Sequence, residues 1–172
     1  MSFNHPKAGP NYVPAYQISG IPFVTSSIDH EVPGPDSDSL SAPVSVSFPF
    51  VTKFITVRNT GPNELRVGFS ADGVIAPGER RATVNADKLV TGPGSTRNFF
   101  LIPTASVSQG GSDIQTFDVR CKQIFFLSNV EPTSDPTTLG LSTSFSLLAG
   151  LTGIQASQFP ALTGSNGFEG VG

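Results

Sequence analysis

The sequence is poor in the side chains that carry most enzyme chemistry. It has no Trp, a single cysteine (Cys121) and two histidines (His5 and His30) among 172 residues. One cysteine excludes an internal disulfide. A zinc site needs several Cys or His ligands at close spacing, and a two-histidine iron site would have to use both His5 and His30. We therefore expect a structural or binding protein without catalytic residues, metal or cofactor.

Charge and long apolar runs are also scarce. Charged residues make up 13% of the chain, against roughly 25% in typical soluble proteins, which predicts that much of the surface contacts other protein. No block of like charge indicates direct nucleic-acid binding. The longest continuous apolar runs are four residues, whereas a membrane span needs about 20. The start MSFNHPKAGP does not resemble a signal peptide. We expect a soluble chain without a membrane span, made and used, or assembled, inside a cell.

The few charges are unevenly distributed. Residues 1–43 carry one basic and four acidic side chains, residues 44–128 nine basic and six acidic ones, and residues 129–172 three acidic ones. Acidic ends around a basic middle would help extended segments to dock on neighbouring bodies. Chance fluctuation of small numbers explains the pattern at least as well.

The sequence is rich instead in β-forming patterns. Fourteen Phe and many Val, Ile and Leu fall into short runs separated by Gly, Pro, Ser and Thr. Apolar residues occupy every second position from Val44 to Phe50, separated by Ser45, Ser47 and Pro49. This alternation is typical of a half-buried strand. The alternation then slips near residues 49–51, which predicts a bulge or corner. Further strands are predicted at Ile55–Val57, Leu65–Phe69, Phe99–Ile102, Ile114–Val119, Cys121–Leu127 and Phe145–Leu151. The continuous apolar run Phe99–Ile102 predicts a strand that is covered on both sides.

These patterns predict an all-β protein with a single β-sandwich. Residues 1–43 contain seven Pro and are interpreted as an extended N-terminal arm with a short edge strand at Ile21–Val24. Residues 44–151 form the predicted body. Residues 152–172 form a C-terminal tail that packs on the body or on a neighbour. Seven or eight strands without the Cys…Trp…Cys spacing of immunoglobulin domains favour a jelly roll.

The remaining candidate sites have simpler explanations. Cys121 alternates with Val119 and is predicted to face the core as a small apolar side chain. The stretch Gly92–Arg97 lacks the Gly-Lys-Ser/Thr ending of a phosphate-binding loop and is predicted to be a turn. Oxygen ligands for Ca²⁺ at Asp36 and Asp38 are less favoured than a solvated acidic loop. Three other features are weak candidates for stacking or phosphate binding: Arg80–Arg81, Tyr12 and Tyr16.

Several segments resemble the penton proteins, the vertex capsid proteins of nucleocytoplasmic large DNA viruses. The resemblance covers most of the chain, from about Pro14 to Gly172, and its motifs are structural. The segments that carry it are PAYQISGIPFVTSS (14–27), VSFPFVTKFITVRN (46–59), LRVGFS (65–70), CKQIFFLSN (121–129), LLAGLTGI (147–154) and FPALTGSNGFEGVG (159–172).

The resemblance implies a single jelly roll that forms a homopentamer at the fivefold vertices of an icosahedral virion. It implies the major capsid protein and minor capsid or cement proteins as partners, and no catalytic residues. Some family members carry an inserted domain for host contact. Here residues 71–98 form the longest candidate insertion and are too few for a separate domain, which puts a receptor role in doubt.

Two other functions remain open at this stage. The first is a sugar- or receptor-binding jelly-roll module, which would need an exposed aromatic patch or a Ca²⁺ loop. The second is an enzyme that uses Asp and Glu residues distant in sequence, although nothing in the sequence selects a pair.

Overall fold

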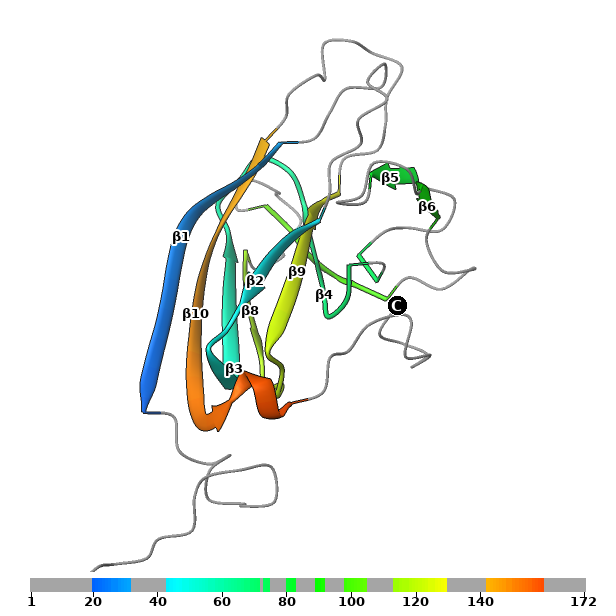
Figure 1. Ribbon diagram of the computed structural model, residues 1–172. Helices are drawn as coiled ribbons and strands as arrows, with labels where there is room; N and C mark the ends of the chain where they lie inside the picture. Colours follow the sequence, from blue (N-terminus) through cyan, green and yellow to red (C-terminus); the bar gives the residue numbers. More distant parts are fainter. Residues whose placement is uncertain are drawn as a thin grey trace, which may run out of the picture.

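The computed structural model describes residues 20–31, 43–71, 73–74, 80–82, 89–91, 98–104, 113–129 and 142–159. Two four-stranded antiparallel sheets face each other (Figure 1), which confirms the all-β class and the β-sandwich. Sheet A has the order β1 (Ile21–Glu31), β10 (Ser142–Gln155), β3 (Phe50–Asn59) and β8 (Ile114–Phe117). Sheet B has the order β2 (Val44–Ser47), β9 (Gln123–Ser128), β4 (Leu65–Gly68) and β7 (Phe100–Ile102).

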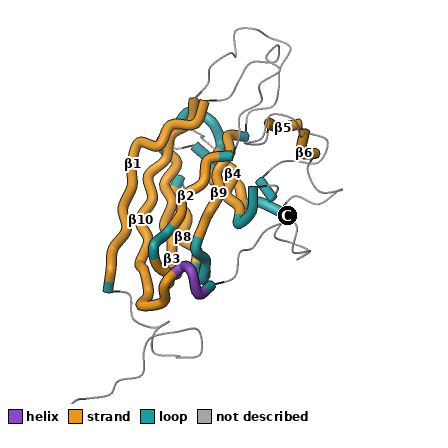
Figure 2. The backbone as a smooth tube through the Cα atoms, viewed as in Figure 1, coloured by secondary structure: helices purple, strands orange, loops and turns teal. Residues whose placement is uncertain are grey.

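Two short elements lie outside these sheets. Strands β5 (Arg80–Ala82) and β6 (Leu89–Thr91) form a two-stranded ribbon. The 3₁₀ helix η2 (Ala156–Gln158) follows β10 at the end of the sandwich where β2 passes into β3 (Figure 2). Its first amide donates a hydrogen bond to the carbonyl of Pro49. None of the described residues forms a helix long and apolar enough to cross a membrane.

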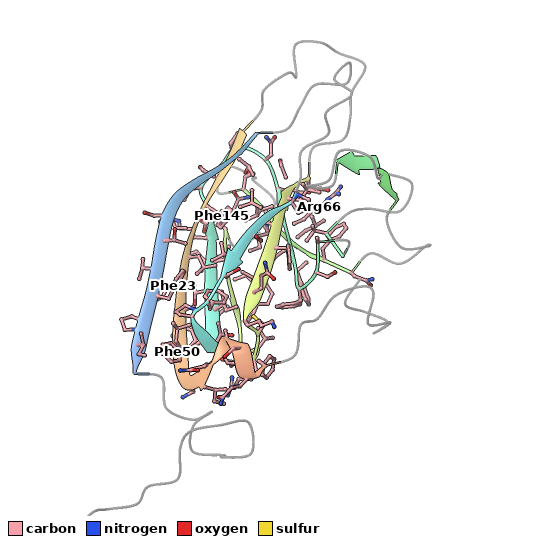
Figure 3. All side chains as sticks on the ribbon, in the orientation of Figure 1. Phe23, Phe50, Arg66 and Phe145 are labelled. Carbon is pink, nitrogen blue, oxygen red and sulfur yellow. The ribbon has the colours of Figure 1, made fainter. Side chains whose placement is uncertain are left out.

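The alternation seen in the sequence builds the core. Along β10, Phe145, Leu147 and Ala149 are buried, while Leu148 between them is 42% exposed. Successive side chains of a strand point to opposite faces, so one face of each sheet is apolar and packs against the other. Figure 3 shows Phe23, Phe50 and Phe145 along this interior.

Aromatic rings connect distant segments inside the core. The ring centroids of Phe126 on β9 and Phe145 on β10 lie 4.0 Å apart. Phe23 on β1 meets Phe48 edge to face, with centroids 5.1 Å apart. These contacts join sheet A to sheet B or to the corner beside it, and aromatic pairs add stabilisation beyond the area that they bury.

The predicted corner near residues 49–51 is where the chain changes sheets. β2 ends at Ser47 in sheet B, and β3 begins at Phe50 in sheet A. Phe48 stays buried at this corner. Opposite the start of β3, the register of β10 shifts around Leu151. The slip in hydrophobic parity therefore marks the crossing between layers.

The edge strand expected at Ile21–Val24 is longer than the sequence indicated. β1 runs to Glu31 and pairs with β10 from Ile21↔Leu151 to Glu31↔Ser142, with one register shift between Thr25 and Ile28. At the other end of the pair, β10 continues four residues beyond the predicted body, to Gln155. Residues 1–19 and 160–172, parts of the predicted arm and tail, lie outside the described residues.

The prediction that the Phe99–Ile102 strand is covered on both sides is wrong. β7 is an edge strand of sheet B, and Phe100 and Leu101 are 58% and 43% exposed. A continuous apolar run does suit a fully covered strand. Because β7 is the last strand in the order of sheet B, one of its backbone edges has no neighbouring strand in the sheet. Much of the Phe100 and Leu101 side chains is therefore exposed to solvent.

Candidate interaction surfaces

The described residues contain no group of three or more His, Cys, Asp or Glu that could hold a metal ion. His30 lies on β1, where its backbone pairs with Thr143. Arg80 and Arg81 lie on β5. The structure does not describe the side chains of His30, Arg80 and Arg81. The other weak candidates from the sequence lie outside the described residues altogether: His5, Tyr12, Tyr16, Asp36, Asp38 and Gly92–Arg97.

Cys121 is buried in the core, as the sequence predicted, with 2% of its surface exposed. Its amide donates a hydrogen bond to Thr52 Oγ1 (3.1 Å), and the Thr52 hydroxyl donates to the carbonyl of Val119 (2.8 Å). Burial raises the pKa of the Cys121 thiol above its ordinary value of 9.0. A neutral, enclosed thiol is a poor nucleophile, so Cys121 serves packing.

This burial predicts a pH-dependent contribution to stability. The folded protein keeps the Cys121 proton to a higher pH than the unfolded chain does, so the contribution is complete below pH 9.0 and declines as the pH rises further toward the folded-state pKa. The difference in free energy of unfolding between the wild type and Cys121→Ala should shrink between pH 9 and 10.5, as measured by urea titration. Rapid alkylation of the native thiol by iodoacetamide at pH 7 would contradict it.

The outer face of sheet B is covered by the chain itself. Arg66 and Leu127, neighbours in register on β4 and β9, point away from the sandwich interior, yet are 1% and 0% exposed. Val74 and Phe99, from the connection between β4 and β7, lie against Arg66. Val74 accepts a hydrogen bond from Arg66 Nη1 at its carbonyl (3.3 Å), and the Phe99 ring lies 4.8 Å from the guanidinium carbon.

Arg66 is held by a chain of polar contacts. Its Nε donates to Asn129 Oδ1 (2.7 Å), and Asn129 Nδ2 donates to Glu64 Oε2 (2.7 Å). Because a buried charge is costly unless it is hydrogen-bonded, these contacts stabilise Arg66 in its buried position beneath Val74 and Phe99. The outer face of sheet B is therefore covered at Arg66 and Leu127, whereas Leu101 on the same face is 43% exposed.

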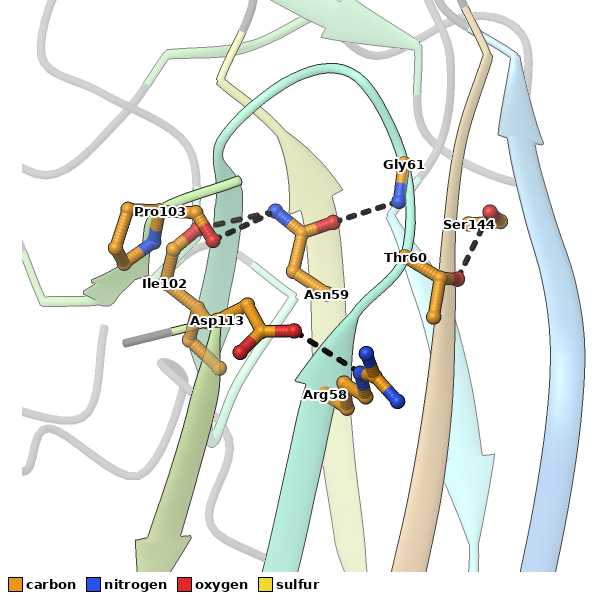
Figure 4. Close-up of polar contacts among 8 residues, drawn as sticks. All are labelled: Arg58, Asn59, Thr60, Gly61, Ile102, Pro103, Asp113 and Ser144. Carbon is orange, nitrogen blue, oxygen red and sulfur yellow. Dashed lines mark hydrogen bonds and ion pairs between the residues drawn. The ribbon is translucent and has the colours of Figure 1, made fainter. Parts of the chain in front are cut away.

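The outer face of sheet A lacks such a cover over its described strands. One row of outward residues crosses all four strands in register: Val24, Leu148, Thr56 and Thr116. None of them is charged, and the Thr56 and Thr116 hydroxyls share a hydrogen bond of 2.9 Å. Arg58, one row along, is paired with Asp113 through an exposed ion pair of 2.9 Å (Figure 4), a kind of contact that contributes little to stability.

The exposed large apolar side chains of the described residues gather at two places. The β1–β10 patch consists of Val24 (69% exposed) and Leu148 (42%), register partners on the outer face of sheet A, while Ile21 (44%) lies on the opposite face of β1. The β7–β8 patch lies where these two strand edges adjoin, and its side chains point to different faces of the strands: Phe100 (58%), Leu101 (43%) and Ile114 (45%). Clusters of exposed apolar residues often mark protein contacts. The two patches are the candidate functional surfaces.

The end of the sandwich near the turn between β3 and β4 is polar and closely packed. Asn59 is fully buried, and its Nδ2 lies 2.8, 3.2 and 3.3 Å from the carbonyl oxygens of Asn63, Ile102 and Pro103. Its Oδ1 accepts from the Gly61 amide at 3.0 Å (Figure 4). Asn59 thus ties the β3–β4 turn to the end of β7.

Only glycine fits at position 61 of this turn, because there is no room for a side chain. A Cβ atom there would lie 2.3 Å from Thr143 Oγ1 and 2.5 Å from the Ser144 amide nitrogen. Thr60 next to it donates its amide to the Ser144 carbonyl (2.9 Å). The turn is therefore pressed against the start of β10, and this end of the sandwich is a structural closure made by side-chain and backbone hydrogen bonds.

Sequence reasoning missed Asn59, Arg66 and both patches. Asn59 begins the stretch Asn-Thr-Gly-Pro-Asn, which is typical of a turn, and Arg66 alternates with Leu65 and Val67 as an outward residue would. No local pattern indicates that either side chain is buried, because the segments that cover them come from elsewhere in the chain. The low fraction of charged residues, 13%, is the one signal in the sequence that indicates contact surfaces.

No protein-family model matches the chain, and no curated protein or solved structure shows significant similarity to it. Function is therefore inferred from the fold and from its surfaces.

Proposed function

We propose that the protein is a structural capsid protein that forms the pentameric vertex, or penton, of an icosahedral large DNA virus, and that its sandwich is a jelly roll. It acts by packing and performs no catalysis. Its partners are other copies of itself, the major capsid protein and minor capsid or cement proteins, and its location is the virion, assembled in the host cell. The observation that carries the proposal is the order in which the strands pair.

The eight sandwich strands pair in a nested series. β1 pairs with β10, β2 with β9, β3 with β8 and β4 with β7. The eight strands thus pair as in one long hairpin, in which the outermost pair is β1 with β10 and the innermost pair is β4 with β7. Two further pairings, β10 with β3 and β9 with β4, wrap this hairpin into two sheets. An eight-stranded double sheet with Greek-key crossings is the jelly roll that recurs in viral capsid proteins.

The surfaces support a role in a shell. The described part of the chain places two exposed apolar patches on the edges of the sandwich and a row of uncharged residues on sheet A. Trp is absent from the sequence, and its one cysteine, Cys121, is enclosed in the core. The resemblance of several segments to penton proteins agrees with this combination.

The solution mass of the purified chain tests the proposal. Light scattering should give five times the chain mass of 18.0 kDa. The same measurement on a chain that begins at Gly20 tests the preceding residues while keeping β1, which is part of sheet A. A pentamer supports the proposal. A trimer, the usual state of a fibre head, or a monomer overturns the homopentamer.

One observation favours a second candidate, a sugar- or receptor-binding module. Phe100 is a strongly exposed aromatic side chain on an edge strand, and sugars stack on exposed aromatic rings. Binding on a glycan array that disappears in Phe100→Ala would support this function, whereas an array without signal would dismiss it.

A further inference from the structure

We infer that the protein binds a water molecule inside the sandwich, between the side chains of Asn63 and Ser128. The site lies beneath the turn between β3 and β4, at the end of the core that Asn59 closes (Figure 4). It does not depend on what the two exposed patches contact, nor on the copy number of the protein in an assembly.

The core changes from apolar to polar at this end of the sandwich. Five segments each carry a polar residue two positions past their outermost core residue, and inward-facing positions of a strand recur every two residues. We call these five residues the polar layer: Asn59 on β3, Asn63 before β4, Thr104 after β7, Ser128 on β9 and Thr143 on β10. All of them except Asn63 are at most 4% exposed.

The pairing of β4 with β9 brings Asn63 and Ser128 near each other. Ser128 is the register partner of Leu65, and Asn63 stands two residues before Leu65. The Asn129 amide donates to the Glu64 carbonyl (2.8 Å), so the pairing continues past Leu65 toward Asn63. Diagonal neighbours on one face of an antiparallel pair lie roughly 7–8 Å apart. The two side chains span part of that distance, and a water molecule that hydrogen-bonds both covers the rest.

Both side chains have a buried polar atom without a protein partner. Among the described residues, Asn63 Nδ2 and Ser128 Oγ are the enclosed side-chain nitrogen and oxygen atoms that make no hydrogen bond to the protein. Such an atom costs free energy when it stays unpaired, and ordered water is the usual partner where the protein supplies none. Two unpaired atoms on neighbouring strands of one polar layer therefore indicate a shared water site.

The chemistry of these two atoms selects water over an ion. An amide nitrogen only donates hydrogen bonds, so a metal cation at the site would face the hydrogens of Asn63 Nδ2. A chloride ion would accept from both side chains, but the polar layer contains no charged residue, and Arg66 points to the outer face of sheet B. An unpaired buried charge is costly. Water is neutral, accepts from Asn63, and either donates to Ser128 or accepts from it.

The water molecule would complete the closure that Asn59 begins. Asn59 Nδ2 joins the β3–β4 turn to the end of β7 through the carbonyls of Asn63, Ile102 and Pro103. The Thr143 hydroxyl joins the same turn to β10 at the Asn63 carbonyl (3.4 Å). A water bridge from Asn63 to Ser128 adds side-chain hydrogen bonding between the turn and the end of β9.

Ser128→Ala tests the site by the sign of its effect on stability. Removing a hydroxyl that has no partner relieves a desolvation cost, so stability would stay the same or rise. Removing a hydroxyl that holds a water molecule should instead raise the equilibrium constant of unfolding about five-fold, the factor that corresponds to one net hydrogen bond. Urea titration of the full chain measures the constant. A Ser128→Ala variant as stable as the wild type, or more stable, overturns the site.

Ser45→Ala is the matched control for this substitution. Ser45 is exposed on β2, a strand that also pairs with β9. The same removal of a hydroxyl from a strand should change the unfolding constant there by about two-fold or less. An equal loss in both variants would mean that the effect comes from replacing serine in a strand, and would overturn the water site.

A crystal structure of the full wild-type chain, grown in the presence of bromide, tests the site without any substitution. Density for one water molecule is expected within about 3.2 Å of both Asn63 Nδ2 and Ser128 Oγ, without an anomalous bromide signal. A bromide peak would assign the site to an anion and overturn the choice of water. A direct hydrogen bond between the two side chains, or no density between them, would overturn the site itself.

Discussion

Replacing Asn59 with Asp is expected to cost about 4 kcal/mol or more at pH 7, a large part of the 5–15 kcal/mol by which a typical domain is stable. The substitution keeps size and shape but removes the donor that faces three carbonyl oxygens, at 2.8, 3.2 and 3.3 Å. It places a negative charge among them at a site with 0% exposure.

The pH dependence identifies the cause. Burial and the carbonyl dipoles raise the pKa of the introduced carboxyl in the folded state above its ordinary value of about 3.9. The folded variant therefore binds a proton that the unfolded chain has lost, and its stability relative to the wild type recovers as the pH falls toward 4 and is lost as the pH rises. Urea titrations of both proteins from pH 4 to 8 measure this difference.

Gln115→Glu is the matched control for this experiment. It makes the same amide-to-carboxylate change on exposed β8, where the side chain donates one exposed hydrogen bond of 3.3 Å to the Thr116 carbonyl. A change within about 0.5 kcal/mol is expected there. An Asn59→Asp variant as stable as the control at pH 7 would show that Asn59 does not hold the turn as described.

Truncating Phe145 to Ala is expected to cost 3–5 kcal/mol, the usual range for large aromatic side chains in well-packed cores. Phe145 is fully buried in β10, the strand that pairs with both β1 and β3. Its ring lies against Phe126 of sheet B, with centroids 4.0 Å apart. The truncation opens a cavity between the two sheets that the surrounding strands cannot easily close, since both sheets hold them in register.

Leu148→Ala is the control on the same strand. Leu148 points to the outer face and is 42% exposed, so its truncation should cost less than about 1 kcal/mol. A double-mutant cycle with Phe126→Ala should give a coupling of roughly 0.5–3 kcal/mol. Equal effects of Phe145→Ala and Leu148→Ala in chemical denaturation would contradict the assignment of inner and outer faces.

The sandwich could be predicted from sequence because each strand shows its own alternation of apolar and polar residues. The alternation over Phe145–Leu151 and over residues 44–50 specifies which side chains face inward before any partner strand is known. The crossing between the two sheets is also visible in the sequence, because the alternation of apolar residues slips by one position at residues 49–51. The prediction for β1 is shorter than the strand itself, because the residues after Val24 are polar except for Ile28. Their pairing depends on β10, more than a hundred residues later.

Exposure was harder to predict than secondary structure because it depends on which strand is an edge. The run Phe99–Ile102 looks covered on both sides, but β7 ends the order of sheet B. Arg66 looks solvent-exposed by alternation, but the segment after β4 covers it. Both candidate patches escape prediction for the same reason. Their apolar side chains lie on an edge strand or on the outer face of a sheet, and no local sequence pattern indicates that position.

The nested pairing of the strands also sets the order of events during synthesis. β1 leaves the ribosome early, but its partner β10 is encoded near the end of the chain, with Ile21 opposite Leu151. At 5–20 residues per second, β1 waits on the order of 10 s for that partner. Sheet A cannot be completed before β10 has been synthesised, and pairings so distant in sequence make folding slow. During this interval Pro22, which has no backbone donor, reduces pairing of β1 with the β1 of another nascent chain on the same messenger RNA.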